Sequence, residues 1–160
     1  MIANEPTFDS PLLPIPAGFE PLRRPDGQYG FVQHCQGIYL HSERRVVAAR
    51  VLPVHLNALN IAHGGFLATL ADTAFGALLR LAGDFPQAPV TIEMSVDYIH
   101  PARPDAWIEA HLEVHKLGRN LCRASLGLMD GTQLIVRAKG TFMANPPSLR
   151  DTPRRETCAV

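Results

Sequence analysis

The chain changes its hydrophobic period once, and this change limits the folds open to it. From His63 to Ala82 the apolar residues recur at the spacing of one helix face. The residues on this stripe are Leu67, Leu70, Ala71, Ala74, Leu78 and Leu81. Elsewhere apolar residues follow the patterns of strands, in segments 37–42, 45–54, 90–98, 106–115, 121–129 and 134–142. The sequence therefore predicts an α+β domain, with one long central helix against an antiparallel sheet of five to six strands.

Prolines suggest where the domain begins and ends. Six of the 14 prolines fall within residues 1–25, and three more follow residue 145. Proline interrupts both helix interiors and sheet ladders. We therefore expect a proline-rich N-terminal arm at 1–27, one domain at 28–144 and an irregular C-terminal tail at 145–160.

Composition excludes several classes of protein. The 15 basic and 15 acidic residues balance, whereas a nucleic-acid-binding surface usually needs a basic excess. No apolar run free of His, Asn or Asp reaches the roughly 18 residues of a spanning helix. The three cysteines, Cys35, Cys122 and Cys158, are too widely spaced for a disulfide framework or a zinc site. We expect a soluble cytoplasmic protein with no bound metal, no nucleic-acid partner and no membrane association.

One acidic residue lies in the middle of the apolar helix. Asp72 is the only formally charged residue between Arg50 and Arg80. A carboxylate among apolar neighbours loses hydration and needs partners, so it is a candidate for catalysis. The alternative is a structural aspartate that is hydrogen-bonded to a neighbouring segment.

The predicted helix begins with His63-Gly64-Gly65. The first N–H groups of a helix have no internal partner and carry the positive end of the helix dipole. Two glycines would let a substrate approach these N–H groups, as an oxyanion does in acyl transfer. A Gly-Gly pair that only forms a tight turn is the alternative.

These residues resemble a known family signature. Asn57, His63-Gly64-Gly65 and Leu70-Ala71-Asp72 resemble the motif of hotdog-fold acyl-CoA thioesterases, closest to the phenylacetic-acid-degradation (PaaI-type) branch. The resemblance extends through residues 90–98, Pro101-Ala102 and 116–120 to a strand that reaches Phe142, and covers about residues 37–144. It implies the hotdog fold, a homodimer with shared active sites and a pairing of two such dimers.

The resemblance also implies roles for particular residues. Asp72 would act as general base or nucleophile on a thioester, and the Gly64 N–H would polarise its carbonyl. Asn57 would hold the attacking water or the carbonyl, and Thr91 would orient the water. Strand alternation, however, puts Thr91 on the face of Glu93, Ser95 and Asp97, opposite the core.

The resemblance places the coenzyme A part of the substrate near other residues. Arg119, after Gly118, stands where relatives often carry a basic residue near the phosphates, and Lys116 and Arg103 are weaker candidates. His63 and Gly65 would also contact the substrate. The alternative for His63 is a structural role, in which it fixes the loop before the helix by hydrogen bonds to the backbone.

Helix geometry separates the two main catalytic groups. Gly64 and Asp72 are eight residues apart, which is about 12 Å along a helix. One carbonyl cannot contact both groups of the same chain, so Asp72 would come from a second subunit. We therefore expect a dimer as the active unit.

The predicted function is hydrolysis of an acyl-CoA thioester to coenzyme A and a carboxylic acid. No separate cofactor is expected, because coenzyme A is part of the substrate. A non-catalytic acyl-CoA binding or sensing protein is the main alternative. A hotdog dehydratase fits less well, because its active-site motifs are absent.

Overall fold

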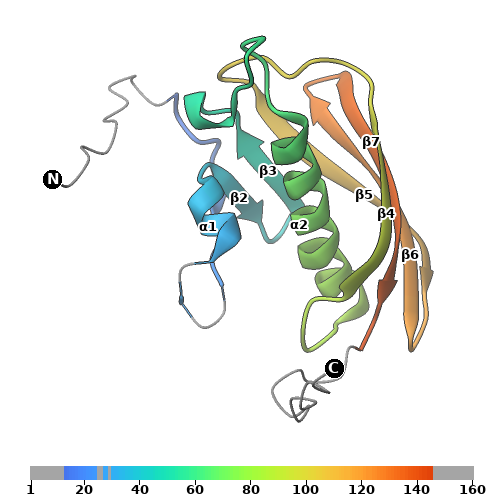
Figure 1. The fold of residues 1–160 in the computed structure, drawn as a ribbon. Helices are drawn as coiled ribbons and strands as arrows, with labels where there is room; N and C mark the ends of the chain where they lie inside the picture. Colours follow the sequence, from blue (N-terminus) through green and yellow to red (C-terminus); the bar gives the residue numbers. More distant parts are fainter. Residues whose placement is uncertain (1–12, 25–26, 29, 146–160) are drawn as a thin grey trace, which may run out of the picture.

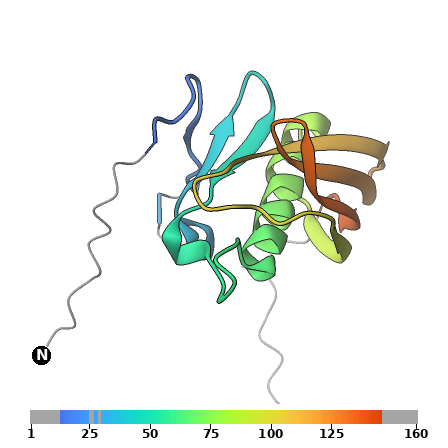
Figure 2. The ribbon, with the colours of Figure 1, turned by 90° about the horizontal axis from the view of Figure 1, so that it is seen from above.

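The computed structural model describes residues 13–24, 27–28 and 30–145. Their strands form one antiparallel seven-stranded sheet in the order β1-β2-β3-β5-β6-β7-β4. The bounds are β1 Glu20–Pro21, β2 Ile38–His41, β3 Val46–Arg50, β4 Val90–Tyr98, β5 Trp107–Leu117, β6 Leu121–Asp130 and β7 Gln133–Met143. The sheet bends around the long helix α2, Gly64–Gly83, which runs along its concave side (Figures 1 and 2).

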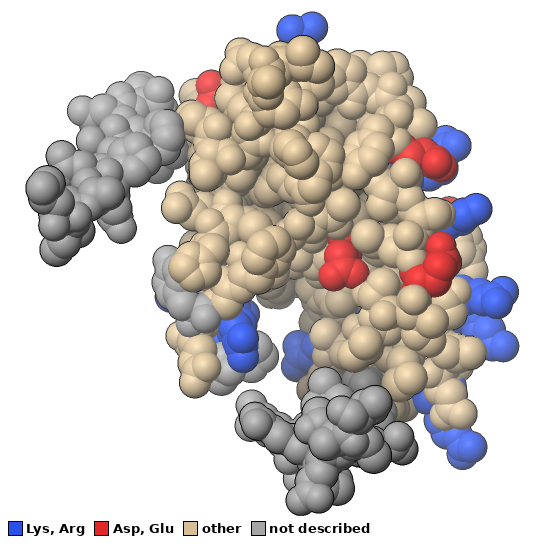
Figure 3. Space-filling model, viewed as in Figure 1, with Lys and Arg blue, Asp and Glu red and all other residues tan. Residues whose placement is uncertain are grey.

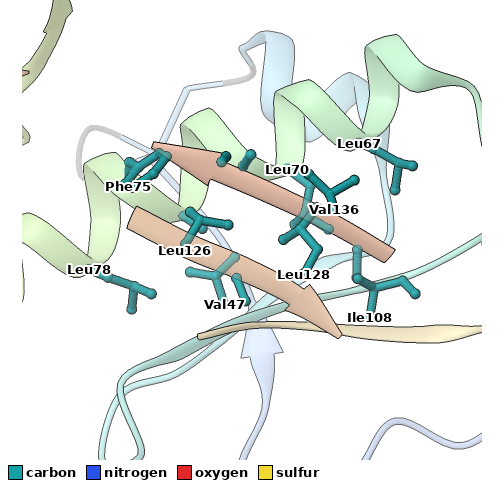
Figure 4. Packing of buried hydrophobic residues seen from close by; sticks show 14 of the residues in the cluster. Val47, Leu67, Leu70, Phe75, Leu78, Ile108, Leu126, Leu128 and Val136 are labelled. Carbon is teal, nitrogen blue, oxygen red and sulfur yellow. The ribbon is translucent and has the colours of Figure 1, made fainter. Parts of the chain in front are cut away.

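The helix α2 buries its apolar stripe against the sheet. Its eight buried side chains include Leu70, Phe75 and Leu78, which meet inward-facing residues of β3, β5, β6 and β7 (Figure 4). The Phe75 ring packs on Phe142 of β7, with the ring centroids 4.8 Å apart. By length and composition α2 could also cross a membrane, but burial of this stripe is typical of a core helix.

Both ends of α2 are capped by identifiable residues. His63 is the N-cap, and its ring Nδ1 accepts the Gly65 N–H at 2.9 Å. Asp84 ends the helix in the left-handed conformation, with φ 49°, and its N–H bonds to the Arg80 carbonyl. The predicted helix of 63–82 thus agrees with the structure to within one residue at each end.

The α+β hotdog fold is confirmed, and the structure adds three short elements. The helix α1, Phe31–Cys35, and the 3₁₀ turn η1, Pro53–His55, flank the first strands of the sheet. Strand β1 pairs with β2 and brings the strand count to seven, above the expected five to six. Its two residues include Pro21, so neither its length nor its composition is that of a strand. Residues 1–12 and 146–160, most of the expected arm and tail, lie outside the described residues.

The segment before β2 is anchored on the outer face of the sheet. Phe19 packs edge-on against Trp107, with the ring centroids 5.0 Å apart. The side chain of Arg50 lies over the same indole at 4.9 Å and donates to the Asp105 carbonyl at 2.7 Å. These contacts fix the path of the chain just before Leu22 and Arg23, two residues that face α2 across a groove described below.

Candidate active site

One face of α2 is not covered by the sheet and carries small and polar residues. This face consists of Gly65, Thr69, Asp72, Thr73, Gly76 and Arg80, which share one side at helical spacing. Asp72 is exposed on the single chain, which corrects the expectation that burial removes its hydration. The cause is its direction, since Asp72 points away from the stripe that the sheet covers.

Thr91 of β4 holds the Asp72 carboxylate. Its Oγ1 donates to Asp72 Oδ1 at 2.6 Å. A short hydrogen bond to an ionised acceptor is among the stronger kinds. The bond fixes Oδ1 and does not involve Oδ2. The second oxygen can therefore accept a proton or attack a carbonyl carbon.

The expected outward direction of Thr91 is wrong, because β4 has an irregularity at Ile92. Thr91 pairs with the buried Phe142, whereas Glu93 pairs with Thr141 and leaves Ile92 without a partner in the register. A β-bulge of this kind shifts the alternation by one residue and redirects a side chain. Thr91 therefore faces α2, while Glu93 keeps its outward direction.

The start of α2 presents one N–H group without a partner. The Gly65 N–H is taken by the His63 ring, whereas the Gly64 N–H makes no hydrogen bond with any residue that the structure describes. On the other side of Gly64, Tyr98 donates its hydroxyl to the Gly64 carbonyl at 2.8 Å. A Cβ at position 64 would lie 3.2 Å from the Tyr98 ring, so glycine leaves room for this contact. Sequence patterns gave no indication that Tyr98 holds the helix start.

Asn57 organises the loop before the helix. Its Oδ1 accepts the N–H groups of Leu59 at 2.8 Å and Ile61 at 3.4 Å. The Asn57 N–H also bonds to the Ile61 carbonyl at 2.9 Å, which closes the loop. Its amide oxygen is therefore occupied by the backbone, and the Nδ2 group has no hydrogen bond to a described residue.

Gly118 and Arg119 lie in the turn between β5 and β6. Gly118 has to be glycine, because a Cβ there would lie 2.6 Å from the Leu121 carbonyl oxygen. This turn is at the end of the sheet where Leu121, Met143 and Val90 are in register, whereas Tyr98 and Gly64 are at the other end. A single chain thus joins Asp72 to Thr91 but does not bring Arg119 to the helix start.

Two hollows lie along the uncovered face of α2. The α1–α2 groove, of about 790 Å³, runs between α1 with its preceding segment and the C-terminal half of α2. Asp72 and Thr91 lie on its wall, and basic side chains flank the opening (Figure 3). The helix-start pocket, of about 460 Å³, includes His63, Gly65 and Thr69, and it shares Phe31 with the groove. Substrate-sized space therefore adjoins both ends of the expected site.

Beside the helix-start pocket lies a buried histidine that the sequence did not single out. His55 is 4% exposed and stacks on Phe66, with ring centroids 3.6 Å apart. Its Nδ1 accepts the Leu52 N–H at 2.9 Å, so Nε2 donates to the Cys35 carbonyl. Burial lowers the pKa of His55, and its hydrogen bonds to the backbone only partly offset this. His55 is therefore a neutral structural residue.

No group of three or more His, Cys, Asp or Glu side chains in residues 13–24, 27–28 and 30–145 is arranged to hold a metal ion. The groups that the structure does provide are a fixed carboxylate, a helix N-terminus with an unpaired N–H and adjoining apolar space. Such a set can activate water and polarise a carbonyl.

Comparison with known proteins assigns the chain to a family. A family model described as the thioesterase superfamily matches residues 59–136. A Pseudomonas aeruginosa protein named "Putative esterase PA0474" is 34% identical over 137 residues, which cover 82% of this chain and 98% of that protein. The chain belongs to the thioesterase superfamily.

Two further relatives of this thioesterase superfamily member are informative. Mouse acyl-coenzyme A thioesterase 13 is 28% identical over 101 residues, 62% of this chain and 71% of the mouse protein. The solved structure of a mutant phenylacetic acid degradation protein PaaI from Thermus thermophilus superposes with a TM-score of 0.58 at 26% identity. That match covers 80% of this chain and 94% of the PaaI chain.

Proposed function

We propose that the protein hydrolyses acyl-CoA thioesters, with Asp72 as the general base or nucleophile. The observation that carries the proposal is the 2.6 Å hydrogen bond from Thr91 to Asp72 on the wall of the α1–α2 groove. It orients the only acidic side chain among the described residues that line this groove. The similarity to a mouse acyl-coenzyme A thioesterase supports coenzyme A as the thiol part of the substrate.

The reaction needs few groups. As a base, Asp72 Oδ2 takes a proton from water, whose oxygen attacks the thioester carbon. As a nucleophile, the same oxygen attacks the carbon and water then cleaves the resulting anhydride. In either case the Gly64 N–H stabilises the negative charge on the carbonyl oxygen, and the C–S bond breaks to release coenzyme A.

The two catalytic groups belong to different subunits in this proposal. The eight residues between Gly64 and Asp72 span about 12 Å of helix, too far for one carbonyl to contact both. Strand β4, which carries Thr91, is the last strand of the sheet, and its Ile92 side chain is 54% exposed. Pairing of two β4 edges would form a dimer, and two dimers would form the tetramer that the resemblance implies.

A thiol-release assay with a panel of acyl-CoAs tests the proposal. We expect the wild type to cleave at least one thioester, and Asp72→Asn and Asp72→Ala to lose about 100-fold or more in kcat. Asp97→Asn is the matched control, because Asp97 is an exposed aspartate of β4 on the outer face of the sheet. A wild type that binds acyl-CoA but releases no thiol would identify a binding protein instead.

A further inference from the structure

The α1–α2 groove continues well beyond Asp72 and becomes positively charged. Arg80, two helical turns further along α2, lies about 12 Å from Asp72 along the axis. Arg23 lines the opposite wall, and Arg24 also lines the groove. Asp72 is the only acidic residue among the described residues of the lining. The groove therefore has a local excess of positive charge, although the 15 basic and 15 acidic residues of the whole chain balance.

Two of these guanidinium groups are not used by the fold. Within the part of the chain that the structure describes, neither Arg23 nor Arg80 makes a side-chain hydrogen bond or an ion pair. By contrast, Arg44 pairs with Glu109 at 2.9 Å, and Arg50 donates to the backbone. Unpaired guanidinium groups at the margin of an apolar groove are suited to a planar anion such as a carboxylate.

Between Asp72 and the arginines the groove suits hydrocarbon better than amide groups. Its walls are mainly apolar, formed by Leu22, Phe31, Val32, Leu40, Ala77, Leu81, Pro86, Ala88 and Pro89. Besides Thr91, its uncharged polar side chains are Gln33, Thr73 and Gln87, and Gln33 is already engaged, since Nε2 donates to the Leu22 carbonyl and Oε1 accepts the Gly30 N–H. The pantetheine arm of coenzyme A carries two amides, which would find few partners here. The acyl group is the better occupant.

We propose that the α1–α2 groove binds an acyl group whose far end carries a carboxylate, and that Arg80 and Arg23 bind this carboxylate. The inference rests on the proposed function, which places the thioester at Asp72. It makes acyl groups derived from dicarboxylic acids the preferred substrate class. Arg80, about 12 Å from Asp72 along α2, is a specificity-determining residue and not a catalytic one, and Arg23 adds a second guanidinium group to the same groove.

Equilibrium binding tests this inference without relying on catalysis. The probes are two uncleavable thioethers of coenzyme A, carboxypentyl-CoA and hexyl-CoA, titrated by calorimetry against wild type, Arg80→Gln and Arg23→Gln. We expect the wild type to bind carboxypentyl-CoA more tightly than hexyl-CoA. Each substitution should lower the affinity for carboxypentyl-CoA roughly 10- to 100-fold and the affinity for hexyl-CoA less than about twofold. The reason is that only a charge-assisted hydrogen bond to the carboxylate is lost.

Two further arms identify the anion and the correct arginine. Arg123→Gln, on the outer face of β6, is the control and should change neither affinity. Arg80→Gln could instead lower the affinity for both thioethers equally, and this loss of affinity could disappear with analogues that lack the 3′-phosphate. In that case the arginine binds coenzyme A and the inference is wrong. Equal wild-type affinity for the two thioethers would also overturn it.

Activity then separates the inference from the proposed function. If the wild type cleaves hexanoyl-CoA as well as adipyl-CoA, with no effect of Arg80→Gln on either, the thioesterase proposal holds and the subsite is wrong. If the thioethers bind as expected but no thioester is cleaved, the subsite holds and the thioesterase proposal is wrong.

Discussion

At the scale of single residues, the site depends on Thr91, whose direction cannot be predicted from strand alternation. Asp72 could be singled out from sequence because no other charge lies near it in the helix. For its partner Thr91, strand alternation predicts the wrong face, because alternation assumes a regular strand and β4 has a bulge at Ile92. Nothing in the residue types at 90–93 marks that irregularity. The exposure of Asp72 differs from the expected loss of hydration, although Asp72 lies off the apolar stripe that the sheet covers.

The bond between Thr91 and Asp72 leads to a prediction about rate. Thr91→Val removes the hydroxyl with little change in volume, so Asp72 loses the group that orients it. We expect kcat for a cleaved acyl-CoA to fall roughly tenfold, the order of one charge-assisted hydrogen bond. Thr91→Ser retains the hydroxyl and should keep most of the activity in the same thiol-release assay. A loss in Thr91→Ser that equals or exceeds the loss in Thr91→Val would contradict the role of the hydroxyl, because only the valine variant lacks it.

His55 leads to a prediction about pH. Because burial lowers its pKa below the ordinary value of 6.5, the unfolded chain binds a proton at His55 more readily than the folded chain does. Its contribution to stability is complete above pH 6.5 and is lost as the pH falls toward the lower folded-state pKa. The slope it adds is at most about 1.4 kcal/mol per pH unit.

Urea unfolding of wild type and His55→Gln between neutral and mildly acidic pH measures this contribution. The difference in unfolding free energy between the two proteins should shrink as the pH decreases below 6.5. A constant difference across this range would contradict the assignment of a neutral His55.

At the scale of elements, the long and regular parts of the fold were predictable. The helix and the strands from β4 to β7 have enough residues for their period to be clear, and their bounds agree with the structure to within a few residues. The short elements were not predictable. α1 has five residues and β1 has two, so tertiary contacts such as the pairing of Pro21 with Tyr39 decide their conformation.

The contact between α2 and β7 provides a stability prediction. Phe75 is fully buried against Phe142, so Phe75→Ala leaves a cavity between helix and sheet. We expect it to lower the unfolding free energy by about 3–5 kcal/mol. Phe31→Ala is the control, because Phe31 is 71% exposed and its removal should cost less than about 0.5 kcal/mol. Chemical denaturation monitored by circular dichroism measures both, and similar values for the two would contradict this packing.

At the scale of the whole molecule, the proposed sharing of active sites between subunits can be tested by mixing inactive variants. Gly64→Pro removes the N–H at the first helical position, where proline is tolerated. Gly64→Ala is its control, since it has the same Cβ near Tyr98 but keeps the N–H. We expect the alanine variant to remain far more active than the proline variant.

Subunits of Gly64→Pro and Asp72→Asn are then mixed in equal amounts under conditions that allow exchange. If each site takes its N–H from one subunit and its carboxylate from the other, a mixed dimer has one intact site. The mixture should recover about a quarter of the wild-type activity, because half of the dimers are mixed. If each chain forms its own complete site, every site stays defective and no activity returns.

The two edges of the described sheet are unequal, and this sets an upper limit on how such chains can join. The β4 edge offers nine residues to a neighbouring strand, whereas the β1 edge offers two, one of them Pro21, which has no N–H. A contact that pairs β4 with β4 would use the long end strand of both chains, and the longest unpaired stretch then left in each described sheet is 111–117 of β5, which extends past β3. Growth beyond such a pair would therefore have to begin at the β5 stretch and not at a full end strand.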